Sequence, residues 1–118
     1  MIKRNMNIKN IPSILWGGGV SKLFIAIHGN MSNKEDDVIV ILAEEAVKKG
    51  YQVLSFDLPE HGDRKDEKDY KCNVQNCVND LNTIMDYAKL LSNDISLFAC
   101  SIGAYFSLLS YKDESLRQ

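Results

Sequence analysis

The residues whose types and spacing are most suggestive of chemistry lie in segment 97–104, which reads LFACSIGA. The apolar stretch Ile95–Ala99 predicts a buried strand that runs into Ser101, and residues 102–111 predict a helix. A serine held in a tight turn with small residues on both sides, including Gly103, presents its hydroxyl as a nucleophile for an acyl carbonyl. The alternative is an ordinary strand-to-helix turn in which this serine has no chemical role.

The elements that must position this serine alternate between apolar strands and helices along the chain. Strands are predicted at Ile11–Trp16, Leu23–Ile27, residues 51–56 and Ile95–Ala99, and helices over residues 33–49, 73–91 and 102–111. This order predicts a single domain over residues 1–118 of the α/β class, with a mostly parallel sheet flanked by helices.

Local signals set the expected boundaries of these elements. The run from Gly17 to Gly19 predicts a hairpin turn between the first two strands. Ser32 and Glu35 predict a capping box at the start of the first helix, and Gly50 predicts its end. The charged run 64–71 predicts a solvated loop. One face of the first helix is expected to hold Val38, Ile41, Leu42, Glu45 and Ala46. The second helix has an apolar stripe through Val74, Cys77, Val78, Leu81, Ile84, Met85, Ala88 and Leu91.

Composition and charge exclude several classes of function. The chain has 118 residues, of which 45% are hydrophobic and 25% charged, with a net charge of -2. These values are ordinary for a globular domain and give no electrostatic reason to expect nucleic acid as a partner. No run of roughly 18 apolar residues predicts a membrane span, and no apolar segment follows the basic residues near the N-terminus. The expected location is therefore the cytoplasm.

The three cysteines, Cys72, Cys77 and Cys100, are an odd number without the spacing of a metal site. They are expected to be reduced thiols, and no metal is expected. Cys100 lies next to Ser101, and we expect it to be a buried, inert packing residue rather than a catalytic thiol.

Two further motifs follow the second and third predicted strands. His28-Gly29-Asn30 comes directly after Leu23–Ile27, and the segment 57–62, DLPEHG, comes directly after the strand 51–56. Together with the serine segment, these motifs resemble the α/β-hydrolases in their order and in their positions at strand ends. The first resembles the family's HG-x oxyanion loop, the second its D-x-P-x-H-G segment, and the third its nucleophile elbow, with Ala99 in place of the first glycine.

The resemblance implies a role for particular residues. Ser101 would be the nucleophile, and the backbone N–H groups of Ile102 and of Asn30 or Met31 would form the oxyanion hole. The residues that would shape the loops near the site are His28, Gly29, Asp57, His61, Gly62 and Gly103. The family implies no metal or organic cofactor for this chemistry.

The resemblance is incomplete, because in the family the acid and the histidine follow the serine. No histidine follows Ser101, and Asp113 and Glu114 are expected only at the end of the last helix. We expect His28 to hydrogen-bond the loop backbone and His61 to be structural or solvent-facing. The chain is thus expected to be the N-terminal half of an α/β-hydrolase, truncated before the C-terminal strands and catalytically incomplete.

The sequence leaves two functions open. The first is a serine hydrolase acting on small acyl esters, and the alternative is a non-catalytic binding or interaction protein on the same scaffold. Nucleotide binding is disfavoured, because Gly17 to Gly19 are expected to join two strands and G-x-G-x-x-G is not met. Ile95–Ala99 would be an exposed edge strand, which predicts a homo-oligomer paired through it.

Overall fold

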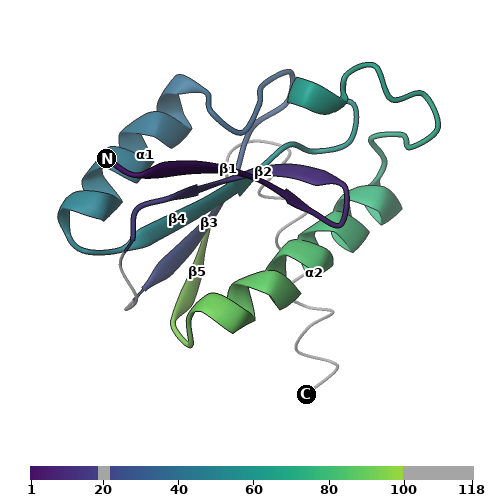
Figure 1. The fold of residues 1–118 in the computed structure, drawn as a ribbon. Helices are drawn as coiled ribbons and strands as arrows, with labels where there is room; N and C mark the ends of the chain where they lie inside the picture. The colour runs from purple at the N-terminus through teal and green to yellow at the C-terminus, as the bar shows by residue number, and fades with distance from the viewer. Residues whose placement is uncertain (19–21, 100–118) are drawn as a thin grey trace.

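A computed structural model describes residues 1–18 and 22–99 and shows a five-stranded sheet in the order β1-β2-β4-β3-β5 (Figure 1). Its strands are β1 Lys3–Ile8, β2 Ile11–Trp16, β3 Leu23–Ile27, β4 Gln52–Phe56 and β5 Ile95–Ala99. β2 pairs antiparallel with β1 and β4, whereas β3 pairs parallel with β4 and β5. The α/β class is confirmed, and the described sheet is mixed.

The predicted hairpin between β2 and β3 is wrong, because β4 lies between these two strands in the sheet. The hairpin instead joins β1 to β2 through Lys9 and Asn10, whose φ angles of 48° and 72° suit a two-residue turn. β1 was missed because it is an edge strand of mostly exposed, polar residues, in which only Ile8 is buried.

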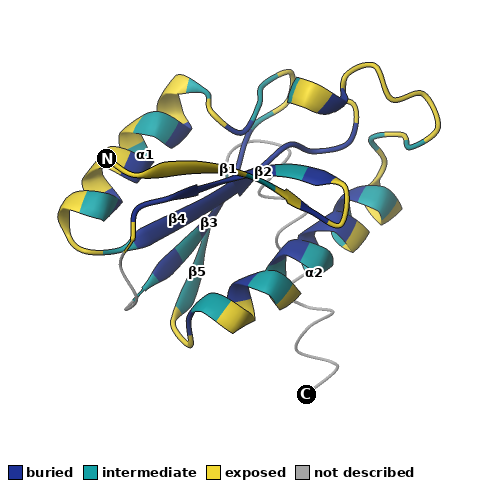
Figure 2. Cartoon of the chain, in the orientation of Figure 1, coloured by how far each residue is buried: buried dark blue, intermediate teal, exposed yellow. Residues whose placement is uncertain are grey.

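Two helices cover opposite faces of the sheet, α1 Asp37–Lys48 and α2 Val74–Leu91 (Figure 1). Successive strand residues point to opposite faces, so neighbours such as Val53 and Leu54 belong to different core clusters. The cluster under α1 contains Ile14, Trp16, Ala26, Ile39, Ala43, Ala46 and Val53. All five residues of β4, in the middle of the sheet, are consequently buried (Figure 2).

The start of α1 differs from the predicted capping box. Asp36 is the N-cap, and its carboxylate accepts the N–H of Ile39 at 2.9 Å, while Ser32 donates its hydroxyl to that same carboxylate. The predicted face is also wrong in part, because Val38 and Ile41 are exposed. The buried residues are Ile39, Ala43 and Ala46. Gly50, with φ 81°, follows the last turn of the helix as predicted.

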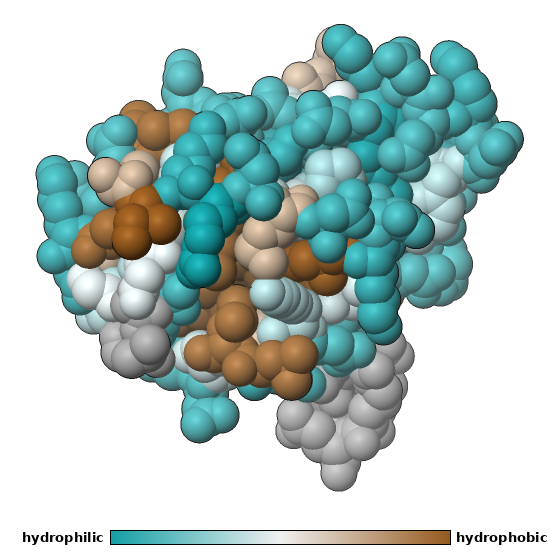
Figure 3. Space-filling model, in the orientation of Figure 1, coloured by the Kyte–Doolittle hydropathy of each residue, from teal (hydrophilic) through white to brown (hydrophobic). Residues whose placement is uncertain are grey.

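α2 is confirmed, with the Asn73 side chain as its N-cap. Its buried residues are Cys77, Asp80, Leu81, Ile84 and Ala88. The charged run that precedes it is exposed over residues 65–69, but Arg64 is buried, which corrects the prediction of a wholly solvated loop. Figure 3 shows that the face in view is largely hydrophilic, with apolar side chains gathered in separate patches.

β5 is confirmed as a strand, but its five residues are half-buried rather than fully buried. Within the described part of the chain it pairs on one side only, with β3. The helix predicted over residues 102–111 lies outside the described residues. None of the described helices is both long enough and apolar enough to cross a membrane.

Candidate active site

The candidate site lies where the parallel strands end. Ile27 of β3 is in register with Phe56 of β4 and Ala99 of β5, so the loops that begin at His28 and Asp57 leave the same edge of the sheet. The structure therefore brings together seven of the candidate residues, namely His28, Gly29, Asn30, Met31, Asp57, His61 and Gly62. The other three, Ser101, Ile102 and Gly103, lie outside the described residues.

His28 ties the first loop to the second. Its Nε2 accepts the N–H of Leu58 at 3.0 Å, so this nitrogen carries no proton and Nδ1–H donates to the Gly29 carbonyl at 2.7 Å. The ring is buried, and burial lowers the pKa of His28 below its usual value although the Gly29 hydrogen bond opposes this shift. His28 is therefore neutral, with both nitrogens engaged, and does not serve as a proton acceptor in this arrangement.

His61 makes the reciprocal tie from the second loop to the first. Its Nε2 accepts the N–H of Met31 at 3.0 Å, and its Nδ1–H donates to the Pro59 carbonyl at 2.9 Å. The centroids of its ring and the His28 ring are 5.0 Å apart. The histidine of each loop thus accepts a hydrogen bond from a backbone N–H of the other loop, and both rings hold their proton on Nδ1.

These contacts distinguish the two amides that the sequence left as oxyanion donors. Met31 has a left-handed φ of 61° and its N–H is taken by His61. Asn30 is exposed, and its N–H has no hydrogen-bond partner among the described residues. Of these two amides, only that of Met31 has a hydrogen-bond partner within residues 1–18 and 22–99.

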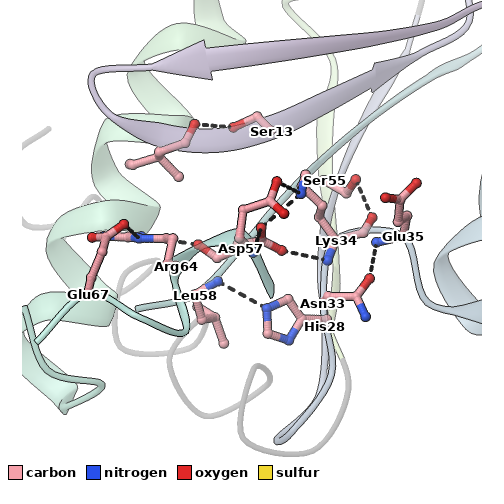
Figure 4. A network of polar contacts seen from close by, with 12 residues as sticks. Ser13, His28, Asn33, Lys34, Glu35, Ser55, Asp57, Leu58, Arg64 and Glu67 are labelled. Atoms are coloured by element: carbon pink, nitrogen blue, oxygen red, sulfur yellow. Dashed lines mark hydrogen bonds and ion pairs between the residues drawn. The ribbon is translucent and has the colours of Figure 1, made fainter. Parts of the chain in front are cut away.

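Asp57 is a buried junction of the same two loops. Its carboxylate accepts the backbone N–H and the side-chain ammonium of Lys34, each at 2.9 Å (Figure 4). It also accepts the N–H of Asp63 at 2.9 Å. Gly62 has φ 55°, and a Cβ there would lie 2.3 Å from the Asp57 carboxylate. A glycine is required at 62 because the carboxylate occupies the place of a side chain.

Lys34 is a buried cation that the sequence analysis missed. Its ammonium also contacts the Asp63 carboxylate at 2.8 Å, and its carbonyl accepts the Ser55 hydroxyl at 2.7 Å. Burial alone would lower the pKa of Lys34, but the hydrogen bonds to Asp63 and Asp57 outweigh it and raise the pKa. Lys34 therefore keeps its positive charge although it is buried beside the candidate site.

A second buried cation, Arg64, joins the loop to α2. Its Nη1 donates to the Asp57 carbonyl at 3.1 Å and to the Asp80 carboxylate at 2.6 Å. Tyr70 donates its hydroxyl to the other Asp80 oxygen at 2.9 Å, and burial followed by this carboxylate raises the pKa of Tyr70 to about 12. The signal for this network was Asp80 itself, a charged residue on the apolar face of α2.

A hollow of about 440 Å³ lies beside the two loops, a volume within the range of small-molecule sites. Its lining residues are Met31, Ser32, Asn33, Glu60, His61, Gly62 and Lys65. Among the described residues, no group of three or more His, Cys, Asp or Glu side chains is placed to hold a metal ion. The lining of the hollow includes both a negatively charged side chain, Glu60, and a positively charged one, Lys65.

No family model and no curated protein matches this chain. Several solved structures do match this chain. Est1E from Butyrivibrio proteoclasticus, solved with ferulic acid, has a TM-score of 0.75 at 20% identity over 95% of this chain and 48% of its own. A putative hydrolase from Agrobacterium vitis S4 has a TM-score of 0.80 at 13% identity, over 99% of this chain and 47% of its own. The α/β hydrolase GrgF from Penicillium sp. sh18 has a TM-score of 0.76 at 16% identity, over 92% and 40%.

These identities are low, and the chain spans about half the length of the solved structures it matches. What they share with it is the fold. The chain has the fold of an α/β-hydrolase, over about half the length of those proteins.

Proposed function

We propose that this chain carries the nucleophile and the oxyanion hole of a serine hydrolase that acts on small acyl esters. Ser101 would attack the acyl carbonyl, and the N–H groups of Asn30 and Ile102 would bind the oxyanion that forms. The observation that supports this proposal is the pair of histidine contacts between the two loops, which engages the Met31 amide and not that of Asn30, in a loop that begins directly after Ile27, the register partner of Ala99.

The same tie argues against either described histidine as the general base. Both nitrogens of His28 and of His61 bond within the two loops, and no histidine follows Ser101 in the sequence. A base must still take the serine proton as the acyl bond forms. We therefore propose that the chain on its own is catalytically incomplete and that the base comes from outside the residues described.

The test is chemical rescue of serine labelling. The folded chain is treated with a fluorophosphonate, with and without imidazole as an external base, and the adduct is read by intact mass. We expect slow labelling alone, at least tenfold faster labelling with imidazole, and none for Ser101→Ala. Cys100→Ala is the matched control for the neighbouring nucleophile and should label like the parent. Circular dichroism confirms that each variant is folded.

The result that would overturn the proposal is a folded chain in which imidazole produces no adduct on Ser101. The fold would then be a scaffold with another role, such as binding. A His61→Ala variant separates the oxyanion part of the proposal from the nucleophile. We expect it to slow the rescued labelling, because the loop that carries Asn30 loses its tie to the second loop.

We also propose that a second copy pairs with β5. Within the described sheet this strand is an edge and its residues are half-buried, including the apolar residues that pack against the core, namely Ile95, Leu97 and Ala99. An unprotected apolar edge favours pairing with another strand, and a two-fold axis would make the contact self-complementary. Light scattering after size exclusion tests this, because a monomer at all concentrations would contradict it.

A further inference from the structure

Two thiols lie in contact at the start of α2. The Sγ atoms of Cys72 and Cys77 are 3.7 Å apart. Cys72 immediately precedes the N-cap residue Asn73, and Cys77 lies in the first turns of the helix. Side chains at these two positions commonly pack against each other and fix the angle at which the chain enters a helix. Here both members of that pair are able to form a covalent bond.

We propose that Cys72 and Cys77 are a modification site at which a low-molecular-weight disulfide, such as oxidised glutathione, generates an intrachain disulfide. The Cys72 thiolate attacks one sulfur of the small disulfide, whose S–S bond breaks and releases one thiol. The Cys77 thiolate then attacks the Cys72 sulfur, the second small thiol leaves, and the Cys72–Cys77 bond forms. Two protein thiols are oxidised, one small disulfide is reduced, and the two protons leave with the released thiols.

Burial assigns the order of the two steps. Cys72 is half-buried, whereas Cys77 is buried, so Cys72 is the more accessible of the two thiols. Burial raises the pKa of the Cys77 thiol, and the neighbouring Cys72 thiol raises it further, so little thiolate forms there at neutral pH. Cys72 therefore reacts first with the small disulfide, and Cys77 then resolves the mixed disulfide, in a step that becomes faster as the pH rises.

The geometry requires only a local movement. A disulfide has sulfurs about 2.05 Å apart, so the two atoms must approach by roughly 1.7 Å. Cys77 is fixed in the core by α2, and Cys72 belongs to the loop that precedes the helix, so Cys72 is the residue that moves. Its N–H donates to the Glu60 carboxylate at 2.6 Å, and Glu60 lines the hollow beside His61. The bond would therefore act on the wall of the candidate site.

The test uses the Cys100→Ser variant, which has only these two thiols. The folded variant is incubated with oxidised glutathione, quenched with acid, and its free thiols are counted after unfolding alongside intact mass. We expect both thiols to disappear with the loss of two hydrogen atoms and no glutathione adduct, and a reductant to restore them. Adding Cys77→Ser should leave one glutathione attached to Cys72, and adding Cys72→Ser should leave Cys77 reduced.

Two results would overturn the proposal. One is a stable glutathione adduct on Cys72 that Cys77 never displaces, even at alkaline pH where circular dichroism shows the chain still folded. The other is a folded variant that keeps both thiols under conditions that oxidise the same variant in urea. This site does not depend on the hydrolase proposal, because its readouts are thiol count and mass rather than labelling of Ser101.

Discussion

Replacing Lys34 by methionine should destabilise the chain more than any removal of a surface charge. Lys34→Met keeps the unbranched apolar stem of the side chain but removes the ammonium from the Asp57 carboxylate, 2.9 Å away. The side chains of this pair are only 7% and 0% exposed. The carboxylate would remain in the interior with the N–H groups of Lys34 and Asp63 as its only described partners.

The magnitude follows from that burial. Removing one partner of a buried ion pair costs about 3–5 kcal/mol, and the two remaining amide donors place the expected loss near the lower value, about 3 kcal/mol. The matched control is Lys48→Met, which breaks an ion pair with Glu45 whose side chains are 72% and 63% exposed. Pairs of that kind contribute about 0.5 kcal/mol or less.

Urea unfolding measures both losses. Trp16 is the single tryptophan, is buried, and reports unfolding by its fluorescence. A slope of roughly 1.5 kcal/mol per molar urea turns the expected 3 kcal/mol into a fall of about 2 M in the midpoint. Lys34→Met combined with Asp57→Asn should recover part of the loss, because the uncompensated charge is gone. Equal midpoints for Lys34→Met and Lys48→Met would refute the buried pair.

Three further predictions concern the same loops. Gly62→Ala should lower the free energy of unfolding by at least about 2 kcal/mol, because the new Cβ meets the Asp57 carboxylate. Gly50→Ala has open space around its Cβ and should cost only about 1 kcal/mol for its positive φ. Thermal unfolding of both variants checks this difference. The pKa of His28 in the folded chain is below its ordinary value of 6.5. Below pH 6.5 the unfolded chain therefore binds the proton more readily than the folded chain, and the free energy of unfolding falls. Urea midpoints at decreasing pH should show this loss, and His28→Asn should lessen the dependence of the midpoint on pH. The Tyr70 hydroxyl has a pKa of about 12 in the folded chain, against an ordinary 10. It should therefore ionise at a higher pH in the folded chain than in the unfolded chain, so the free energy of unfolding falls above pH 10. The tyrosinate absorbance of the native chain minus that of Tyr70→Phe should show this late titration.

The elements that the sequence predicts well are those with a clear period. The α2 stripe repeats as a helix requires, and β3 is a continuous apolar run between polar segments. The face of α1 could not be predicted in the same way, because the run from Val38 to Leu42 is apolar at every position and carries no period. β1 gave no signal, since an edge strand with one buried residue has no alternation to detect.

The clustering of the His28 and Asp57 loops was predictable for a topological reason, because parallel strands bring their carboxyl ends to one edge. The buried charged residues that hold those loops could not be predicted from the sequence. Arg64 belongs to the run predicted to be a solvated loop, and no prediction was made for the burial of Lys34. Only a partner distant in the sequence makes the burial of these two cations favourable. For Arg64 that partner is Asp80, sixteen residues away. The place of Asp80 on the apolar face of α2 signals a buried charge, but no local pattern identifies Arg64 as its partner.

The two sets of contacts act on different parts of the first loop. The Asp57 ion pair holds its far end at Lys34, and the two imidazoles hold the segment around Asn30, because His28 is tied to the second loop on one side and Met31 on the other. An amide stabilises a developing negative charge best when it needs no reorganisation at the moment of reaction. Asn30 is exposed, yet both of its flanks are fixed, and this combination of access and rigidity is what an oxyanion donor requires. In the proposed reaction, the two histidines would act through the backbone that they hold, and another group would transfer the proton.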